Sequence, residues 1–516
     1  MLALLLSANL FSAQLPDNPT ANLRLVTANP TRIAYNPVRD FASAEIEYGL
    51  TRGDFHAVTA SANAHQLRGD LYGLRHIGAW DMQGRFSYSN LQDHDQRWET
   101  RLWNEPANPY YVCDSVAGNT TTEAFHLSFT LAYTLSDRWK LGLDAALSTG
   151  ERADQSDPRP GTSAMVIPVV VGSEWYNGAS WHVGASGGIE AYSSTLAYYN
   201  VQPLNNHRYF VMKGMGDYLK RSTGDDSGYK RDYKRLTALG AVQAVWADAT
   251  RHCSQVTEIA WRSGTEEATD GGSSYSFDGG SYAFRTVSLT DAWALRNGTS
   301  AQHSWTLKCA VGDGKGTWAD QKRETDSEHA SRVYYSTLSR SVNHKAQWLQ
   351  AALSYQWEHL LDTRRDCFAS AKIGMEAHRR TNYLGSSSPC QKFSLLSADV
   401  TAGQDLPVRH GSLMLSAEGG YAMPLARQYA NGSLYTGSDD ISAVYTARQF
   451  EYETARQFHL GAIADWSLPI GQPQKHLTAG LAARYQYRRY ADSDFCWQGY
   501  GGTSAHTLRL SCYLCF

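Results

Sequence analysis

The last eleven residues of the chain alternate between apolar and polar side chains. One face would carry His506, Leu508, Leu510, Cys512, Leu514 and Phe516, and the other would carry Thr507, Arg509, Ser511, Tyr513 and Cys515. Successive side chains of a β-strand point to opposite faces, so this order predicts a strand with one apolar and one polar face that ends on an aromatic residue. Such a strand requires an apolar medium on one side and water on the other.

The same period of two recurs along the chain, for example in residues 125–135, 139–148 and 349–357. Repeated alternation in short segments is typical of a transmembrane β-barrel. Period two, with turns placed at clusters of Gly, Asn, Asp and Pro, predicts about eighteen strands, and sixteen is the nearest alternative. The strands are expected near residues 42–51, 67–77, 80–90, 123–135, 139–149, 163–174, 181–192, 234–247, 252–264, 281–295, 302–312, 344–357, 366–378, 391–405, 411–421, 448–468, 475–489 and 504–516.

The predicted connections alternate in length. Short ones such as 136–138 and 176–178 follow every even strand, and long ones such as 91–122 and 193–233 follow every odd strand. This order predicts an all-β, antiparallel transmembrane barrel with short periplasmic turns, long extracellular loops and both ends of the chain on the periplasmic side.

Composition agrees with a barrel and excludes helical spans. No apolar run approaches the roughly 20 residues that a membrane-spanning helix needs, whereas 31 Tyr, 15 Trp and 43 Gly suit interfacial girdles and turns. A belt at the short-turn end is expected from Trp80, Trp139, Trp181, Trp305, Trp357 and Trp466. The net charge of −3 argues against a nucleic-acid partner.

Three segments are expected along the chain. Residues 1–13 have the apolar character of a secretory signal, residues 14–41 would lie at the periplasmic mouth or enter the lumen as a plug, and residues 42–516 would form the barrel. A disordered tail is the alternative for residues 14–41. The eight cysteines are scattered without metal-binding spacing. Cys113, Cys390 and Cys496 fall in expected outer loops, where pairing cannot be deduced from the sequence.

Several short motifs resemble those of an uncharacterised family of outer-membrane β-barrel proteins from Bacteroidota. They are AYNP at Ala34–Pro37, DPRP at Asp157–Pro160, MKGMGDY at Met212–Tyr218, and the terminal Phe516. The resemblance covers the whole mature chain and implies an outer-membrane location rather than a chemistry. AYNP is also similar to the start of fatty-acid-transporter-type barrels, from which this chain departs in strand number and loop length.

The candidate functional residues share the polar parity of the last three strands. Arg484, Arg488 and Arg509 would face the lumen, with Asp465 and His459 on the strand before. A basic ladder on a pore wall can attract anions, and the alternative is a salt-bridged lining. Leu510, Leu514 and Phe516 are expected to form the barrel-closing signal on the lipid face.

Three further motifs are weaker. Asp93-His94-Asp95 in an expected outer loop suggests the acid and base of an outer-membrane hydrolase, but no partner set is found on a neighbouring loop. Gly312–Thr317 lacks the spacing of a phosphate loop and is interpreted as a turn. Asp270-Gly271-Gly272 and Asp278-Gly279-Gly280 could ligate calcium in flexible loops.

The sequence therefore favours a non-enzymatic outer-membrane channel or uptake component for solutes, without a cofactor. The first alternative is an accessory or scaffold barrel that binds a TonB-dependent transporter or a surface lipoprotein. The second is an outer-membrane hydrolase. Membrane lipid and the outer-membrane insertion machinery are the expected general partners.

Overall fold

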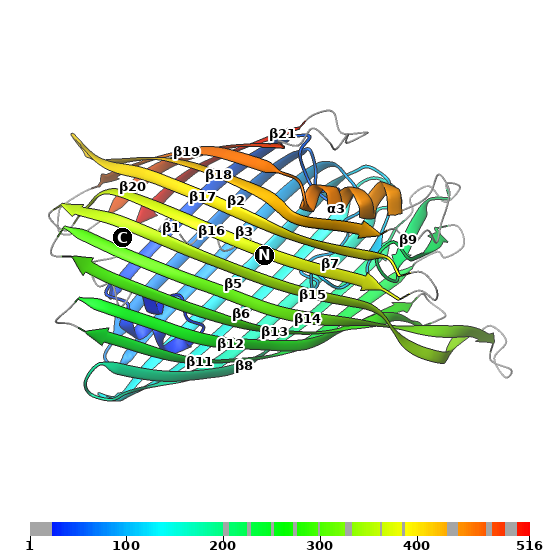
Figure 1. Cartoon of the computed structure of the whole chain (residues 1–516), viewed down its shortest axis with the longest axis horizontal. Helices are drawn as coiled ribbons and strands as arrows, with labels where there is room; N and C mark the ends of the chain where they lie inside the picture. Colours follow the sequence, from blue (N-terminus) through cyan, green and yellow to red (C-terminus); the bar gives the residue numbers. More distant parts are fainter. Residues whose placement is uncertain are drawn as a thin grey trace.

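A computed structural model shows a closed barrel of eighteen antiparallel strands (Figure 1). Strand β1 pairs with β2 on one side and with β21 on the other, which closes the ring. The predicted fold class and strand number are confirmed. The structure describes residues 23–199, 206–223, 229–248, 252–271, 276–297, 300–325, 333–361, 364–383, 388–430, 442–470, 477–490 and 503–516. No described helix is long and apolar enough to cross a membrane.

The barrel strands follow one another around the ring in chain order. They are β1 (Asp40–Gly53), β2 (Asn63–Ile77), β3 (Trp80–Gln96), β5 (Gly118–Ser136), β6 (Trp139–Asp154), β7 (Pro160–Tyr176), β8 (Trp181–Tyr198), β11 (Lys230–Asp248), β12 (Cys253–Gly271), β13 (Ser276–Asn297), β14 (Ala301–Thr325), β15 (Val333–Leu361), β16 (Arg364–Asn382), β17 (Cys390–Val408), β18 (Gly411–Ala430), β19 (Gln457–Pro469), β20 (Thr478–Tyr490) and β21 (Ser504–Cys515). Short turns join them at one end, on the left in Figure 1, and the longer connections lie at the other end.

One predicted strand begins too early. The first part of the expected strand 448–468 is a helix, α3 (Arg448–Glu453), and β19 begins at Gln457. Phe450 of this helix is buried, with its ring 5.8 Å from the ring of Phe393 on β17. Phe450 and Tyr452 are two residues apart, a spacing that fits the alternation of a strand, so the pattern predicted a strand. In the helix the two side chains point in different directions, Phe450 toward Phe393 and Tyr452 toward Phe55.

The interpretation of Gly312–Thr317 as a turn is wrong, because this segment lies inside β14 and pairs on both sides. Its glycines provide space rather than a bend. A Cβ at Gly314 would lie within 2.3 Å of Tyr282 Cζ, and one at Gly312 would lie 2.3 Å from Trp348 Cε2. The glycines therefore accommodate large aromatic rings from the neighbouring strands.

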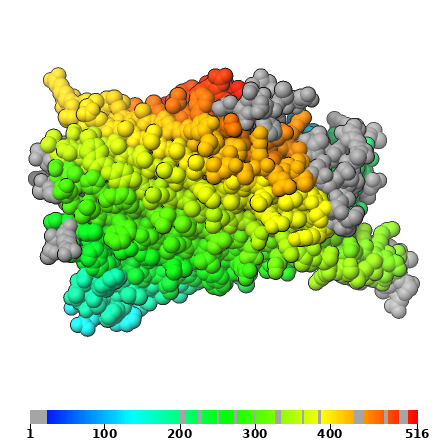
Figure 2. Space-filling model, in the orientation of Figure 1, coloured from blue at the N-terminus to red at the C-terminus, as the bar shows by residue number. Residues whose placement is uncertain are grey.

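Several strands run further toward the long-loop end than the sequence suggested. Much of the expected loops 265–280 and 313–343 is paired within β12, β13, β14 and β15. The ends of β14 and β15 form a hairpin that projects beyond the rim, at the lower right of Figure 1 and Figure 2. We call residues 318–325 with 334–342 the projecting hairpin.

The outer surface of the barrel carries an apolar belt. Ile46, Leu127 and Val171 are 58%, 54% and 58% exposed, as expected for lipid-facing side chains. Exposed tryptophans near the short turns are Trp80, Trp139, Trp181, Trp305 and Trp466. These are five of the six tryptophans that the sequence predicted for an interfacial belt, and the sixth, Trp357, is half-buried.

Candidate functional site: the lumen and its two inserts

Residues 23–39 lie inside the barrel at the short-turn end, where they are blue in Figure 1. Their core is a 3-10 helix, η2 (Pro30–Tyr35), which begins with proline after the capping residue Asn29. Ile33 and Ala34 pack on Ala132 of the inner wall, and all three are buried. We call residues 23–39 the N-terminal insert.

Glycines on three neighbouring strands let this insert touch the wall. A Cβ at Gly172 would lie 2.3 Å from Asn29 Oδ1, and a Cβ at Gly184 would lie 2.8 Å from Asn29 Nδ2. At Gly142 it would lie 2.8 Å from the carbonyl carbon of Pro30. A side chain at any of these positions would displace the Asn29-Pro30 step.

A buried ion pair fixes the insert to β7. Arg24 Nη1 lies 2.5 Å from Glu174 Oε1, and both side chains are at most 3% exposed. Gln243 Nε2 donates to the other carboxylate oxygen at 2.8 Å, and His182 Nδ1 lies 3.0 Å from Oε1. The Arg24 guanidinium also covers the Tyr35 ring, 3.6 Å from its centre. Loss of one partner of such a pair would leave the other charge buried and unpaired, at a cost of about 3–5 kcal/mol.

A second insert fills the opposite, long-loop end. It is a three-stranded sheet made of β4 (Val112–Cys113), β9 (Arg208–Met212) and β10 (Tyr218–Ser222). We call residues 97–117 and 206–223 together the luminal cap. One face of its sheet joins a buried cluster with wall residues Leu196, Tyr198, Phe277, Tyr282, Phe284 and Trp318. The other face packs with Val58, Trp98, Tyr111 and Tyr445.

The motif Met212–Tyr218 forms the tip of the β9–β10 hairpin. Asn343 on β15 donates to the Lys213 carbonyl at 2.6 Å, and Asn382 on β16 donates to the Met215 carbonyl at 2.8 Å. The tip is therefore attached to two strands distant from β9 in the sequence.

Buried charges attach the cap to a second part of the wall. Glu266 on β12 is fully buried, and it accepts hydrogen bonds from Asn108 at 2.8 Å and from Arg235 at 2.9 Å. Arg262 forms an ion pair with Glu105 at 3.2 Å. Because buried ionic groups are costly when unpaired, these contacts favour a single cap position.

Helix α3 also lies at the long-loop end (Figure 1). Glu453 forms an ion pair with Arg380 of β16 at 2.9 Å. Gln449 accepts a hydrogen bond from the Val58 backbone N–H at 3.2 Å, which joins the helix to the β1–β2 connection.

The three predicted arginines lie on the inward-facing side of β20 and β21. Leu481 and Tyr485 on β20 are exposed to the outside, which places Arg484 and Arg488 on the other face. Arg484 and Arg509 are direct cross-strand neighbours, and Arg484 Nη2 lies 3.2 Å from Glu418 Oε2. Within the described part of the chain, no ion pair joins Arg488 or Arg509 to a carboxylate.

The two predicted residues on β19 also face inward, and each contacts a neighbour. His459 Nε2 lies 3.6 Å from Asp399 Oδ1 on β17. Asp465 accepts a hydrogen bond from the Tyr513 hydroxyl at 2.7 Å. Asp465 does not neutralise the arginines, because the described carboxylate beside them is Glu418.

The two halves of the inner wall differ in their exposure. From β7 to β12 many inward-facing residues are buried beneath the inserts, among them Thr162, Glu174, Tyr192, Arg231, Tyr233, Thr237, Val245, Val256 and Glu266, while Arg262 is 28% exposed. On the opposite side, Glu376 is 44%, Asp399 35%, Arg484 29% and His459 27% exposed. We call the inward-facing side of β16–β21 the solvated wall, although Asn382, Phe393 and Tyr490 at its long-loop end are buried. The arginine ladder lies on this wall.

The Asp93-His94-Asp95 motif does not form an acid–base site. It lies at the end of β3 rather than in a loop, so Asp93 and His94 point to opposite faces. Asp93 lies 3.9 Å from Arg152, and the His94 ring lies 5.7 Å from that of His65.

The proposed calcium loops are also largely strand. Asp270 is the penultimate residue of β12 and forms an ion pair with Arg231, while Asp278 in β13 forms one with Arg340. Gly272 lies outside the described residues. All seven described cysteines, including Cys113 and Cys390, are free, and Cys496 lies outside the described residues.

The sequence interpretation missed the anchoring residues of both inserts. Glu174 and His182 appeared as ordinary inward positions of their strands. The cap had a visible signal, because the connections expected to be loops contain the apolar runs 110–113 and 209–212. A solvated loop rarely contains such runs.

Comparisons with known proteins identify a family and several similar solved structures. A family model described as a family of unknown function (DUF6850) matches residues 30–516. No curated protein matches. Three similar solved structures each have a TM-score of 0.42. The RagAB peptide transporter is 6% identical, and the match covers 93% of this chain and 87% of that chain. The copper transporter OprC is 10% identical, with 92% and 80% covered, and the FrpB iron transporter from Neisseria meningitidis is 8% identical, with 95% and 83% covered. None of these three is a fatty-acid-transporter-type barrel.

Proposed function

This chain belongs to the family of unknown function DUF6850, and we propose that this member is a non-enzymatic uptake channel of the bacterial outer membrane. The observation that carries the proposal is the contrast between the two halves of the lumen. One half is filled by the inserts, while the solvated wall carries charged side chains that water reaches. A solute would move along this wall.

The arginine ladder would give this route a preference for anions. Arg484, Arg488 and Arg509 share one wall, and the described carboxylate that pairs with them is Glu418. Salt should screen their field over about 10 Å at 0.1 M.

The luminal cap and α3 would act as a gate on the outer side. Their buried aromatic clusters and their contacts to wall strands β8, β13, β14, β15 and β16 favour the closed position. Transport would require release of at least the contacts that the cap and α3 make with β16 of the solvated wall.

Planar-bilayer recording of the purified protein tests both points. We expect low conductance for the wild type and higher conductance for Asn343→Ala/Asn382→Ala, which frees the tip of the cap. Replacement of all three ladder arginines by Gln in that background should shift the reversal potential in a KCl gradient toward cations.

The matched control replaces Arg75, Arg285 and Arg340 by Gln, because these three side chains are 73%, 70% and 65% exposed and lie outside the lumen. It makes the same change in net charge and should leave selectivity unchanged. An equal shift in both triple variants, or no conductance after the cap is released, would exclude the channel.

The projecting hairpin favours a second candidate function, an accessory barrel. The pairing of β14 with β13 ends at Thr317, and the pairing of β15 with β16 begins at His344. Between these positions β14 and β15 pair with each other. Leu338 is 67% exposed there. A TonB-dependent transporter or a surface lipoprotein could pair with the strand edges of this hairpin that extend beyond the neighbouring strands β13 and β16. Shortening the hairpin should then abolish co-purification of the partner without changing conductance.

A further inference from the structure

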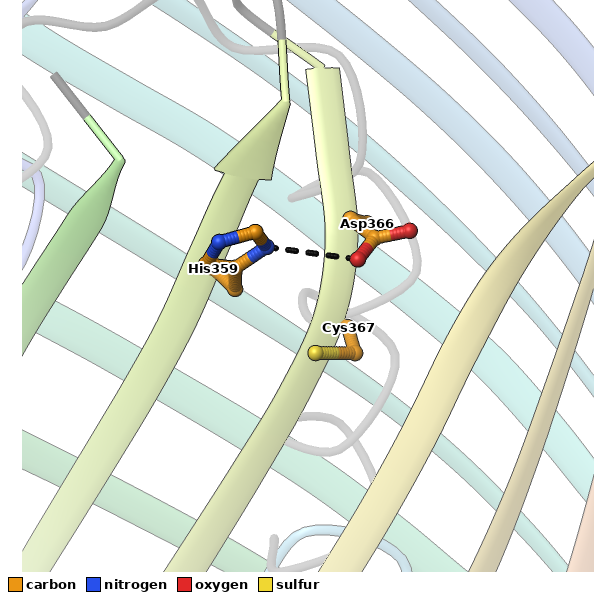
Figure 3. Close-up of side chains that lie close together, drawn as sticks. All are labelled: His359, Asp366 and Cys367. Carbon is orange, nitrogen blue, oxygen red and sulfur yellow. Dashed lines mark hydrogen bonds and ion pairs between the residues drawn. The ribbon is translucent and has the colours of Figure 1, made fainter.

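Three side chains of different chemistry converge at the short-turn end of the β15–β16 hairpin (Figure 3). They are His359 on β15 and the consecutive residues Asp366 and Cys367 on β16. Their potential ligand atoms all lie within 4.8 Å of one another, and His359 Nδ1 is 3.2 Å from Asp366 Oδ2. This is the one such group of three within the part of the chain that the structure describes.

A β-bulge brings the third side chain into the group. His359 pairs with Cys367 and Leu360 pairs with Arg365, so Asp366 has no residue opposite it. In a regular strand the side chains of Asp366 and Cys367 would point to opposite faces. The extra residue turns the strand locally, and Asp366 then reaches His359 from the same side as Cys367.

From this geometry we propose that His359, Asp366 and Cys367 form a zinc-binding site. An imidazole nitrogen, a carboxylate oxygen and a thiolate sulfur are the three ligand types that Zn²⁺ uses in proteins, commonly in a tetrahedral arrangement. Three protein ligands leave a fourth position for water. All three residues are half-buried, so an ion can reach them from solvent.

The position of the site fits exchange with the water phase at the membrane boundary. The His359 ring lies 6.4 Å from the ring of Trp357, one of the tryptophans expected at the short-turn end. The site therefore lies at the short-turn boundary of the apolar belt. A bound ion would link β15 to β16 next to their turn.

Zinc binding to the purified full chain in detergent, with ZnCl₂ alone as the probe, tests the site. We expect one equivalent of Zn²⁺ to bind. Cys367→Ser or Asp366→Asn should weaken that binding by at least about tenfold, because loss of a residue that only hydrogen-bonds to a metal ligand already has an effect of that size. Bound Co²⁺ should show a thiolate charge-transfer absorption that Cys367→Ser removes. Zn²⁺ should also slow maleimide labelling of Cys367.

Two variants serve as controls. Cys309→Ser removes another half-buried thiol, whose cross-strand neighbours Leu289 and Ala351 are not metal ligands. His378→Gln removes a histidine whose side chain lies 3.5 Å from Glu376 and belongs to no group with a cysteine among the described residues. Both should bind Zn²⁺ like the wild type. Heat modifiability of every variant checks that the barrel has formed. Unchanged binding in folded Cys367→Ser and Asp366→Asn, or unprotected labelling of Cys367, would overturn the site.

Discussion

Asp114 is a buried carboxyl in the luminal cap whose pKa differs strongly from its ordinary value. Burial raises this pKa to about 7, although the Val116 N–H and the Tyr198 hydroxyl act in the opposite direction. The folded cap therefore keeps a proton that the unfolded segment releases near pH 4. The contribution of protonated Asp114 to the stability of the folded cap is fully present below about pH 4. It decreases as the pH rises to about 7 and is lost above that pH.

We expect the cap to open more readily at pH 8 than at pH 5. The unfolded carboxyl is already ionised at pH 5, so only the interval from pH 5 to the folded pKa of about 7 contributes. At about 1.4 kcal/mol per pH unit, the difference is about 3 kcal/mol. Hydrogen exchange of residues 97–117 at the two pH values measures it. Asp114→Asn should flatten the dependence, whereas Asp320→Asn in the projecting hairpin should not. An identical pH slope in Asp114→Asn would show that another group is responsible.

Gly172 gives a second prediction at the scale of one residue. Gly172→Ala places a methyl group against Asn29 and should weaken docking of the N-terminal insert by about 1–3 kcal/mol. Trypsin should then cleave after Arg24 or Arg32 about tenfold faster. Gly187→Ala is the control, because the atom nearest to its Cβ would be the Leu239 carbonyl oxygen, 3.8 Å away. Equal cleavage of both variants would mean that the close contact does not hold the insert.

At the scale of an element, neighbouring residues of β17 separate the lipid face from the lumen. Val400 is 60% exposed on the outside, and Thr401 faces inward opposite Glu418. Val400→Arg should cost about 2–4 kcal/mol near the bilayer centre. Thr401→Arg should cost much less. Unfolding by urea in lipid vesicles measures both, and equal costs would contradict the assignment of the two faces.

The sequence predicted the strands well because alternation is imposed by the two media on either side of each strand. Thr130 shows where this reasoning stops. Its inward parity is correct, but it is only 3% exposed, so inward does not mean solvated at this position. Period two assigns a residue to a face and carries no information about an insert that covers that face. For the same reason the ladder could be located on its strands, but its position on the solvated wall required the structure.

The inserts were harder to predict because they lack a period. Asn29-Pro30 suggested a break in regular structure, yet its contact depends on glycines more than a hundred residues later in the chain. The bulge at Asp366 was similarly invisible, because one extra residue does not disturb the overall alternation of β16.

At the scale of the whole molecule, the two ends of the barrel should be distinguishable in intact cells. A cysteine at Thr325, in the projecting hairpin, should react with an impermeant maleimide in a cysteine-free background. A cysteine at Arg409, in the short β17–β18 turn, should react only after permeabilisation. Met215 is unsuitable because it belongs to the anchored tip of the cap. Labelling of the Arg409 variant in intact cells would reverse the orientation.

The pairing of β1 with β21 has a consequence for the order of folding. Paired residues on these two strands, such as Thr51 and Thr507, are 456 positions apart in the chain. Loop-closure entropy makes so remote a contact slow to form. Until synthesis reaches the final strand, the first strand exposes a row of unpaired N–H and C=O groups to whatever surrounds it. We therefore expect the newly made chain to depend on a factor that binds the exposed edge of β1. Once β21 has been made and pairs with this edge, the edge can no longer cause aggregation.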